Sequence, residues 1–88
     1  MLSKEEIYKT VVEVMVEEFE LEESELGMDA RLYEELGLDS LDSVDMVVAL
    51  EKAFDTRMGQ EEELREIRTV GDICRFIEKL QKERAEQA

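Results

Sequence analysis

The chain contains no proline, no histidine and no tryptophan, and only 4 of its 88 residues are glycine. Proline and glycine disfavour helices, whereas the plentiful Glu, Leu, Lys, Arg and Met favour them. Without histidine, a Ser-His-Asp triad is excluded. A chain of this length forms one small domain with one modest core. We therefore predict an all-α domain that is not an enzyme of the serine-histidine type.

Cysteine and long apolar stretches are also scarce. With a single cysteine, Cys74, the chain cannot form an internal disulfide. The absence of disulfides is typical of a reducing environment, so we expect a cytoplasmic protein. We expect Cys74 to pack as a small hydrophobic residue. The longest apolar run, Met46–Leu50, is too short to span a bilayer. No apolar segment follows the charged start at Lys4 and Glu5, so we expect no secretory signal peptide.

Basic residues are few, and their scarcity is confined to the first part of the chain. The net charge is −14, and residues 1–51 hold 16 acidic and 3 basic side chains, against 9 and 8 in residues 52–88. Such a surface repels nucleic acid and anionic membranes, and it attracts proteins with basic patches. We predict protein partners, no nucleic acid and no stable membrane insertion. The alternative is that the acidity only confers solubility.

Helical spacing of apolar residues begins directly after a capping box formed by Ser3 and Glu6. It predicts a helix over residues 4–19. The glutamate-rich segment 20–37 lacks this spacing and is predicted to be a long loop. We expect its few apolar residues to pack onto the core, and a short helical turn near 31–35 to end at Gly37.

The second half of the chain holds three further predicted helices. One begins at Asp39 or Ser40 and ends near residue 54, and a short helix at 61–66 follows a loop at 55–60. The pair Thr69 and Asp72 then caps a final helix over about 70–82. The sequence thus predicts a four-helix bundle of three main helices and one short one. Its domain spans residues 1–80, and a polar tail, 81–88, frays.

The segment Gly37–Met46 contains the triplet Leu-Asp-Ser twice. Projected at 100° per residue, Ser43 falls on the buried face with Met46 and Leu50, where its hydroxyl is expected to bond back to a helical carbonyl. Ser40 falls at the helix start, which faces water and offers free backbone amides to a phosphate. Since the chain has no histidine and the nearest lysine, Lys52, is three helical turns away, Ser40 is predicted to be modified by another enzyme rather than to attack a substrate.

The same projection leaves a second apolar stripe outside the core. Leu41, Val44 and Val48 form this strip, with Asp45 and Glu51 at its edges and Asp42 further round. An apolar strip edged by acids has the composition of a docking surface. The alternative is that the 20–37 loop covers it.

The run Gly37-Leu38-Asp39-Ser40-Leu41, with the acidic helix that continues to Phe54, resembles the attachment segment of acyl carrier proteins. The stretch 68–72 resembles the entry to the last helix of that family, and the resemblance covers residues 3–80. It implies that Ser40 bears 4′-phosphopantetheine, with Asp39 and Leu41 completing the motif. The arm's thiol would carry acyl groups as thioesters, so the chain would be a carrier and not an enzyme.

The resemblance also implies partners: a phosphopantetheinyl transferase, and acyl-transfer, chain-elongating or modifying enzymes with basic docking patches. These would serve fatty acid, polyketide or specialised lipid biosynthesis, and the carrier would be a monomer. The family's recognition helix corresponds here to Leu41, Asp42, Val44, Asp45, Val48 and Glu51. Two places depart from the family pattern: Lys52 replaces a common acid, and Met58-Gly59-Gln60 replaces an Ile-Pro element.

Other functions remain open at this point. An acidic interaction module without a prosthetic group would explain the charge and the strip, and an aminoacyl or peptidyl carrier would share the serine. Calcium binding is disfavoured because Asp39, Asp42 and Asp45 are spaced by three residues, not by two as in an EF-hand loop. We predict no metal site.

Overall fold

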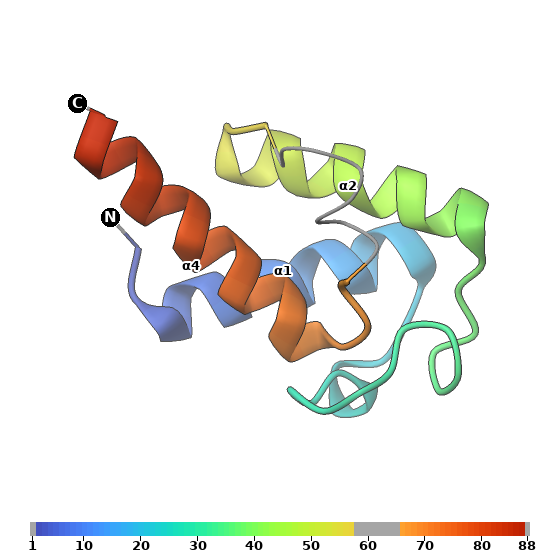
Figure 1. The fold of residues 1–88 in the computed structure, drawn as a ribbon. Coiled ribbons are helices and arrows are strands. Elements are labelled where there is room, and N and C mark those ends of the chain that lie inside the picture. Colours follow the sequence, from blue (N-terminus) through green and yellow to red (C-terminus); the bar gives the residue numbers. More distant parts are fainter. Residues whose placement is uncertain (1, 58–65, 88) are drawn as a thin grey trace.

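The computed structural model describes residues 2–57 and 66–87, and within them it is all-helical (Figure 1). It contains α1 (Lys4–Phe19), the 3₁₀ helix η1 (Glu23–Glu25), α2 (Ser40–Phe54) and α4 (Val70–Gln87). The all-α prediction is confirmed, and the first two main helices have the predicted bounds. The predicted short helix at 61–66 lies almost entirely outside the described residues.

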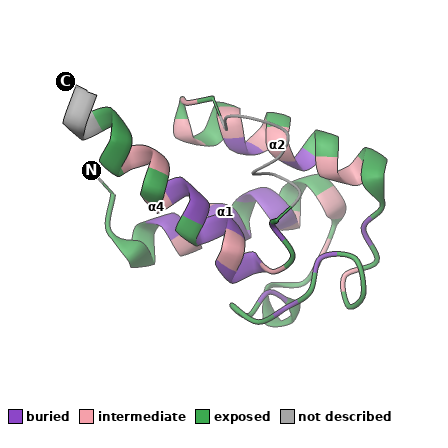
Figure 2. Cartoon of the chain, viewed as in Figure 1, coloured by how far each residue is buried: buried purple, intermediate pink, exposed green. Residues whose placement is uncertain are grey.

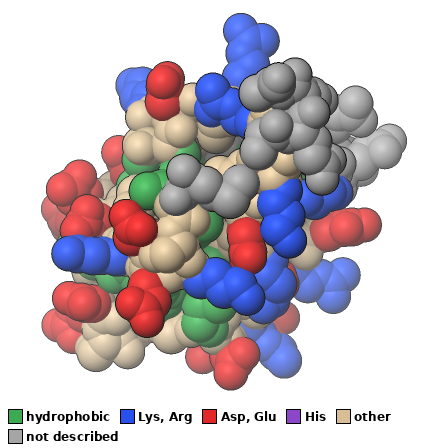
Figure 3. Space-filling view, turned by 90° about the vertical axis from the view of Figure 1, so that its left-hand side faces the viewer, with side chains coloured by type: hydrophobic (Ala, Val, Ile, Leu, Met, Phe, Trp, Pro, Cys, Tyr) green, Lys and Arg blue, Asp and Glu red, His purple; other side chains and the backbone are tan. Residues whose placement is uncertain are grey.

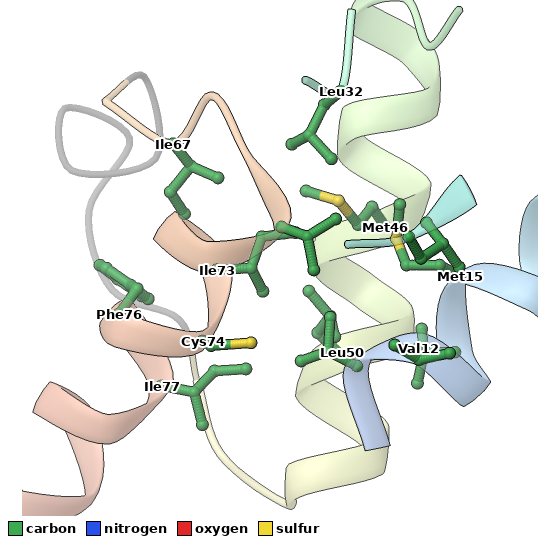
Figure 4. Packing of buried hydrophobic residues seen from close by; sticks show 14 of the residues in the cluster. Val12, Met15, Leu32, Met46, Leu50, Ile67, Ile73, Cys74, Phe76 and Ile77 are labelled. Atoms are coloured by element: carbon green, nitrogen blue, oxygen red, sulfur yellow. The ribbon is translucent and has the colours of Figure 1, made fainter. Parts of the chain in front are cut away.

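Helix α1 is the central element, since it packs against both α2 and α4. It starts as the sequence predicts: the Ser3 hydroxyl accepts the Glu6 N–H at 3.2 Å, and the Glu6 carboxylate accepts the Ser3 N–H at 3.2 Å. Its inner face is buried (Figure 2). Side chains from the other two helices meet it in one aliphatic core, shown in part in Figure 4 and including Val12, Met15, Met46, Leu50, Ile73 and Ile77.

The long loop between α1 and α2 is fixed to the start of α4. Leu32 N–H donates to the Arg68 carbonyl at 2.9 Å, and Val70 and Gly71 donate to the carbonyls of Ala30 and Met28 at 3.1 and 2.8 Å. The loop therefore satisfies backbone amides at a helix start, which has no partners of its own for them. The expectation that the loop's apolar residues pack onto the core holds for Leu26, which is buried, but is wrong for Met28, which is exposed.

The predicted cap of the last helix is present. Thr69 Oγ1 accepts the Asp72 N–H at 3.1 Å, and the Asp72 carboxylate accepts the N–H groups of Thr69 and Arg68 at 3.2 and 3.0 Å. Burial alone would raise the pKa of Asp72, but these donors and the Arg75 guanidinium at 2.7 Å lower it below its ordinary value. Asp72 therefore stabilises the fold at neutral pH, and this contribution is lost as the pH falls through the lowered pKa.

Two details of the helix pattern differ from the prediction. Helix α4 runs to Gln87 rather than to residue 82, so the predicted end was wrong. Residues 81–87 contain no glycine or proline to stop a helix, and Arg84 Nη1 donates to the Asp55 carbonyl at 3.1 Å, which ties α4 to the end of α2. Helix η1 was not predicted, because it is a single turn in a segment without helical spacing.

Gly71 offers a test of the contact between loop and helix. A Cβ at this position would lie 2.9 Å from the Met28 carbonyl oxygen, whereas a Cβ at Gly27 would meet nothing within 4 Å. We expect Gly71→Ala to lower the free energy of unfolding by about 2 kcal/mol, although alanine is the better helix former. Urea unfolding followed by circular dichroism measures this change.

Gly27→Ala is the matched control, and it should change the free energy of unfolding little, because its surroundings are open. If Gly71→Ala were as stable as Gly27→Ala, the close packing of the loop on α4 would be wrong.

Candidate functional site

Asp39 and Asp42 determine where α2 begins. The Asp39 carboxylate accepts the Asp42 N–H at 2.9 Å, and the Asp42 carboxylate accepts the Asp39 N–H at 3.1 Å. Just before them Gly37 has φ 71°, a left-handed conformation that favours glycine, and Leu38 is buried. The chain therefore turns sharply, anchors itself at Leu38, and enters the helix at Ser40.

Ser40 is the first residue of α2, and its side chain is exposed. Among the described residues, none forms a hydrogen bond with Ser40 Oγ. The backbone N–H groups of Ser40 and Leu41 lack helical partners because they belong to the first turn, where the helix dipole is positive. The hydroxyl therefore lies where an attached phosphate would meet free donors, although the segment is acidic.

Ser43 lies one turn further along α2, and its hydroxyl is already engaged. Ser43 Oγ donates to the Asp39 carbonyl at 3.2 Å, as predicted, and is 2.6 Å from the hydroxyl of Tyr33. Ser43 is half-buried, so its predicted place on the buried face holds only in part. The two serines therefore differ in the structure, since Ser40 exposes an unengaged hydroxyl to solvent and Ser43 does not.

Tyr33 had no interpretable signal in the sequence. Its contact with Ser43 joins the turn at Arg31–Leu36, in which the Arg31 carbonyl accepts N–H groups from Glu35 and Leu36 at 3.0 Å, to the first turn of α2. This turn confirms the one predicted near 31–35. A tyrosine ten residues before a helical serine has no characteristic spacing, so only the folded loop reveals the pair.

The apolar strip on α2 is exposed, as predicted. Leu41, Val44 and Val48 have exposed fractions of 75%, 61% and 45%. The alternative that the 20–37 loop covers them is therefore wrong. At the edges, Asp45 is exposed and Glu51 is half-exposed.

Asp42, the third acidic residue assigned to this surface, has a second role. Its carboxylate is half-exposed and accepts the Asp39 N–H, so part of its hydrogen-bonding capacity serves the helix start. This role was not predicted from the sequence, although the spacing Asp39-x-x-Asp42 resembles that of a capping box and could have indicated it.

Cys74 is buried in the core, which confirms its prediction as a packed hydrophobe. Burial raises the pKa of the Cys74 thiol to about 11, so the thiol stays protonated and unreactive at neutral pH. It is therefore unsuited to bear acyl groups.

One face of the molecule mixes basic and acidic side chains. This face, on the side where both chain termini lie, shows Lys and Arg among Asp and Glu (Figure 3), whereas the start of α2 lies toward the opposite side of the molecule (Figure 1). In the described part of the chain, no helix has the length and apolar character needed to cross a membrane. In the same residues, no cluster of three or more Cys, Asp or Glu side chains is suited to hold a metal ion.

Comparison with known proteins shows the family to which the chain is related. Residues 9–77 match the family described as "Phosphopantetheine attachment site". Proteins named "Acyl carrier protein" from Thermotoga maritima and Prochlorococcus marinus are 40% and 42% identical, over 90% and 88% of this chain and 96% and 95% of theirs. One from Borrelia garinii subsp. bavariensis is 37% identical, over 89% of this chain and 96% of its own.

The chain belongs to the acyl carrier protein family. Members of this family are carriers rather than enzymes, and their prosthetic group is 4′-phosphopantetheine. The residues present fit that group, because an exposed hydroxyl at a helix start meets both requirements, access for a modifying enzyme and donors for a phosphate. A carrier of this kind works by contact with enzymes, which agrees with the exposed strip on α2.

Proposed function

We propose that Ser40 carries 4′-phosphopantetheine and that the chain bears acyl groups as thioesters on the arm's thiol. The exposed and unengaged Ser40 hydroxyl at the start of α2 is the observation that supports this most directly. Loading from coenzyme A would form the bond from Ser40 Oγ to phosphorus and break the pyrophosphate bond. It would release adenosine 3′,5′-bisphosphate and the hydroxyl proton. The transferase would supply the base, because the chain has no histidine and the carboxylates of Asp39 and Asp42 are engaged at the helix start.

Asp39 and Leu41 serve this site in different ways. Asp39 holds the helix start through its contact with the Asp42 N–H, and so positions Ser40. Leu41, the most exposed large hydrophobic side chain among the described residues, follows Ser40 directly and is available to an enzyme that approaches it. The arm's thiol would carry the acyl group, and these residues would help to present the arm.

The strip on α2 is the proposed docking surface for the transferase and for the enzymes that load, extend or modify the acyl chain. Its apolar members supply contact area, and its acidic neighbours attract basic patches and speed the encounter. The surface comprises Leu41, Asp42, Val44, Asp45, Val48 and Glu51. Fatty acid, polyketide and specialised lipid biosynthesis in the cytoplasm are the proposed settings, with the carrier acting as a monomer.

Loading with coenzyme A tests the attachment site. The purified chain is incubated with coenzyme A and a broad-specificity phosphopantetheinyl transferase, and its mass is measured. We expect the mass of one arm to be added to the natural chain and to Ser43→Ala, and nothing to be added to Ser40→Ala.

Ser43→Ala is the matched control, because it removes a hydroxyl three residues away in the same helix. Addition to Ser40→Ala would refute the assignment. Loss of addition in Ser43→Ala, in a variant that circular dichroism shows to be folded, would refute it as well.

Val48→Ser tests the docking surface at a distance of two helical turns from Ser40. Replacing the valine removes apolar contact area, which should raise the transferase KM by roughly tenfold, equivalent to about 1.4 kcal/mol, with little change in kcat. Steady-state loading kinetics measure both constants, and increasing salt should lower kcat/KM by screening the acidic neighbours.

Leu2→Ser removes a partly exposed hydrophobic side chain outside α2 and should leave the KM unchanged. Equal KM values for Val48→Ser and the natural chain would show that this strip is not where the transferase docks.

A further inference from the structure

A groove of about 470 Å³ lies along the outer side of α1, where η1 packs against that helix. Val12, which is buried, and Val16, which is half-buried, supply its apolar lining. Tyr8 also lines it, and the Tyr8 hydroxyl donates to the Leu26 carbonyl at 2.6 Å, so this side chain is held in place. The groove therefore has a defined shape in the fold. One of its lining side chains, Tyr8, is fixed by a hydrogen bond to the loop that follows α1.

More acidic than basic side chains line this groove. Glu13, Glu17 and Glu23 line it together with a single cation, Lys9. Within the described residues, none of these three carboxylates has a lysine or arginine as a partner. Lys9 compensates only part of their negative potential, so the groove attracts cations from another molecule.

We propose that this groove binds a basic amphipathic segment of a partner protein. Its apolar side chains would pack against Val12 and Val16, and its lysines or arginines would pair with the three glutamates. A wholly apolar ligand would desolvate carboxylates without pairing them, and nucleic acid or an anionic lipid would be repelled. Charge and apolar lining together select this one class of occupant.

The groove is separate from the strip on α2. It is lined by α1 and η1 residues only, whereas the strip is formed by Leu41, Val44 and Val48. The chain therefore has two surfaces of similar composition on two helices, and a partner could hold α1 while α2 presents its cargo. This proposal does not depend on Ser40, and it gives the glutamate-rich stretch 17–25 a use beyond solubility.

A synthetic helical peptide of leucine and lysine at amphipathic spacing is a suitable probe. It is titrated into the ¹⁵N-labelled chain, and amide shifts and dissociation constants are measured by NMR at physiological salt. We expect shifts at Tyr8, Val12 and Val16. The triple variant Glu13→Gln, Glu17→Gln, Glu23→Gln should weaken binding at this site by roughly tenfold, since three exposed charge pairs are lost.

The matched control removes three charges from the same region but outside the groove. This variant, Glu18→Gln, Glu22→Gln, Glu25→Gln, changes exposed glutamates that do not line the groove, and it should weaken binding less than threefold. Equal weakening in the two variants would reduce the effect to net charge and overturn the proposal. Shifts confined to α2, no binding, or shifts caused by a second copy of the chain in the absence of peptide would also overturn it.

Discussion

The reciprocal contact between Asp39 and Asp42 is the interaction on which the site depends. Each carboxylate accepts the other residue's backbone N–H, and this fixes α2 to begin at Ser40. If the helix began one turn later, Ser40 would lie in the loop and lose its place beside the free amides. If it began one turn earlier, the serine would have an interior helical environment, without free N–H groups near it. The cap therefore places the Ser40 hydroxyl at the helix start, where we propose that the arm is attached.

The central place of α1 accounts for the arrangement of the remaining parts. Because α1 packs against both α2 and α4, its inner face is buried in the core. Helix α2 packs against α1 with one face and exposes the opposite face to solvent. The loop satisfies the amides at the start of α4, and Tyr33 connects the same loop to Ser43. The segment before Ser40 is thus held at two places, the start of α4 and Ser43, which explains how a loop rich in mutually repelling glutamates has a defined path.

Local signals in the sequence were sufficient to predict α1 and α2 and to place Ser40 at a helix start. Capping residues and apolar spacing depend on neighbours within one turn, so α1, the start of α2 and the cap at Thr69 could be predicted. The Tyr33–Ser43 contact, the pairing of Leu32 with Arg68 and the extension of α4 to Gln87 could not, because each depends on residues far apart in the chain. The groove on α1 belongs to this second group, since η1 is placed by tertiary packing.

The backbone NMR spectrum of Asp39→Ala, compared with that of Asp39→Asn, tests most directly whether the Asp39 cap determines where α2 begins. Asparagine keeps a side-chain oxygen that accepts the Asp42 N–H, whereas alanine does not. If the Asp39 cap fixes the start of α2, Asp39→Ala should lose helical chemical shifts and amide-exchange protection from Ser40 to Ser43. Asp39→Asn should keep both, and the rest of the fold should be unchanged in both variants. Unaltered shifts and protection at Ser40–Ser43 in Asp39→Ala would contradict this role of the cap.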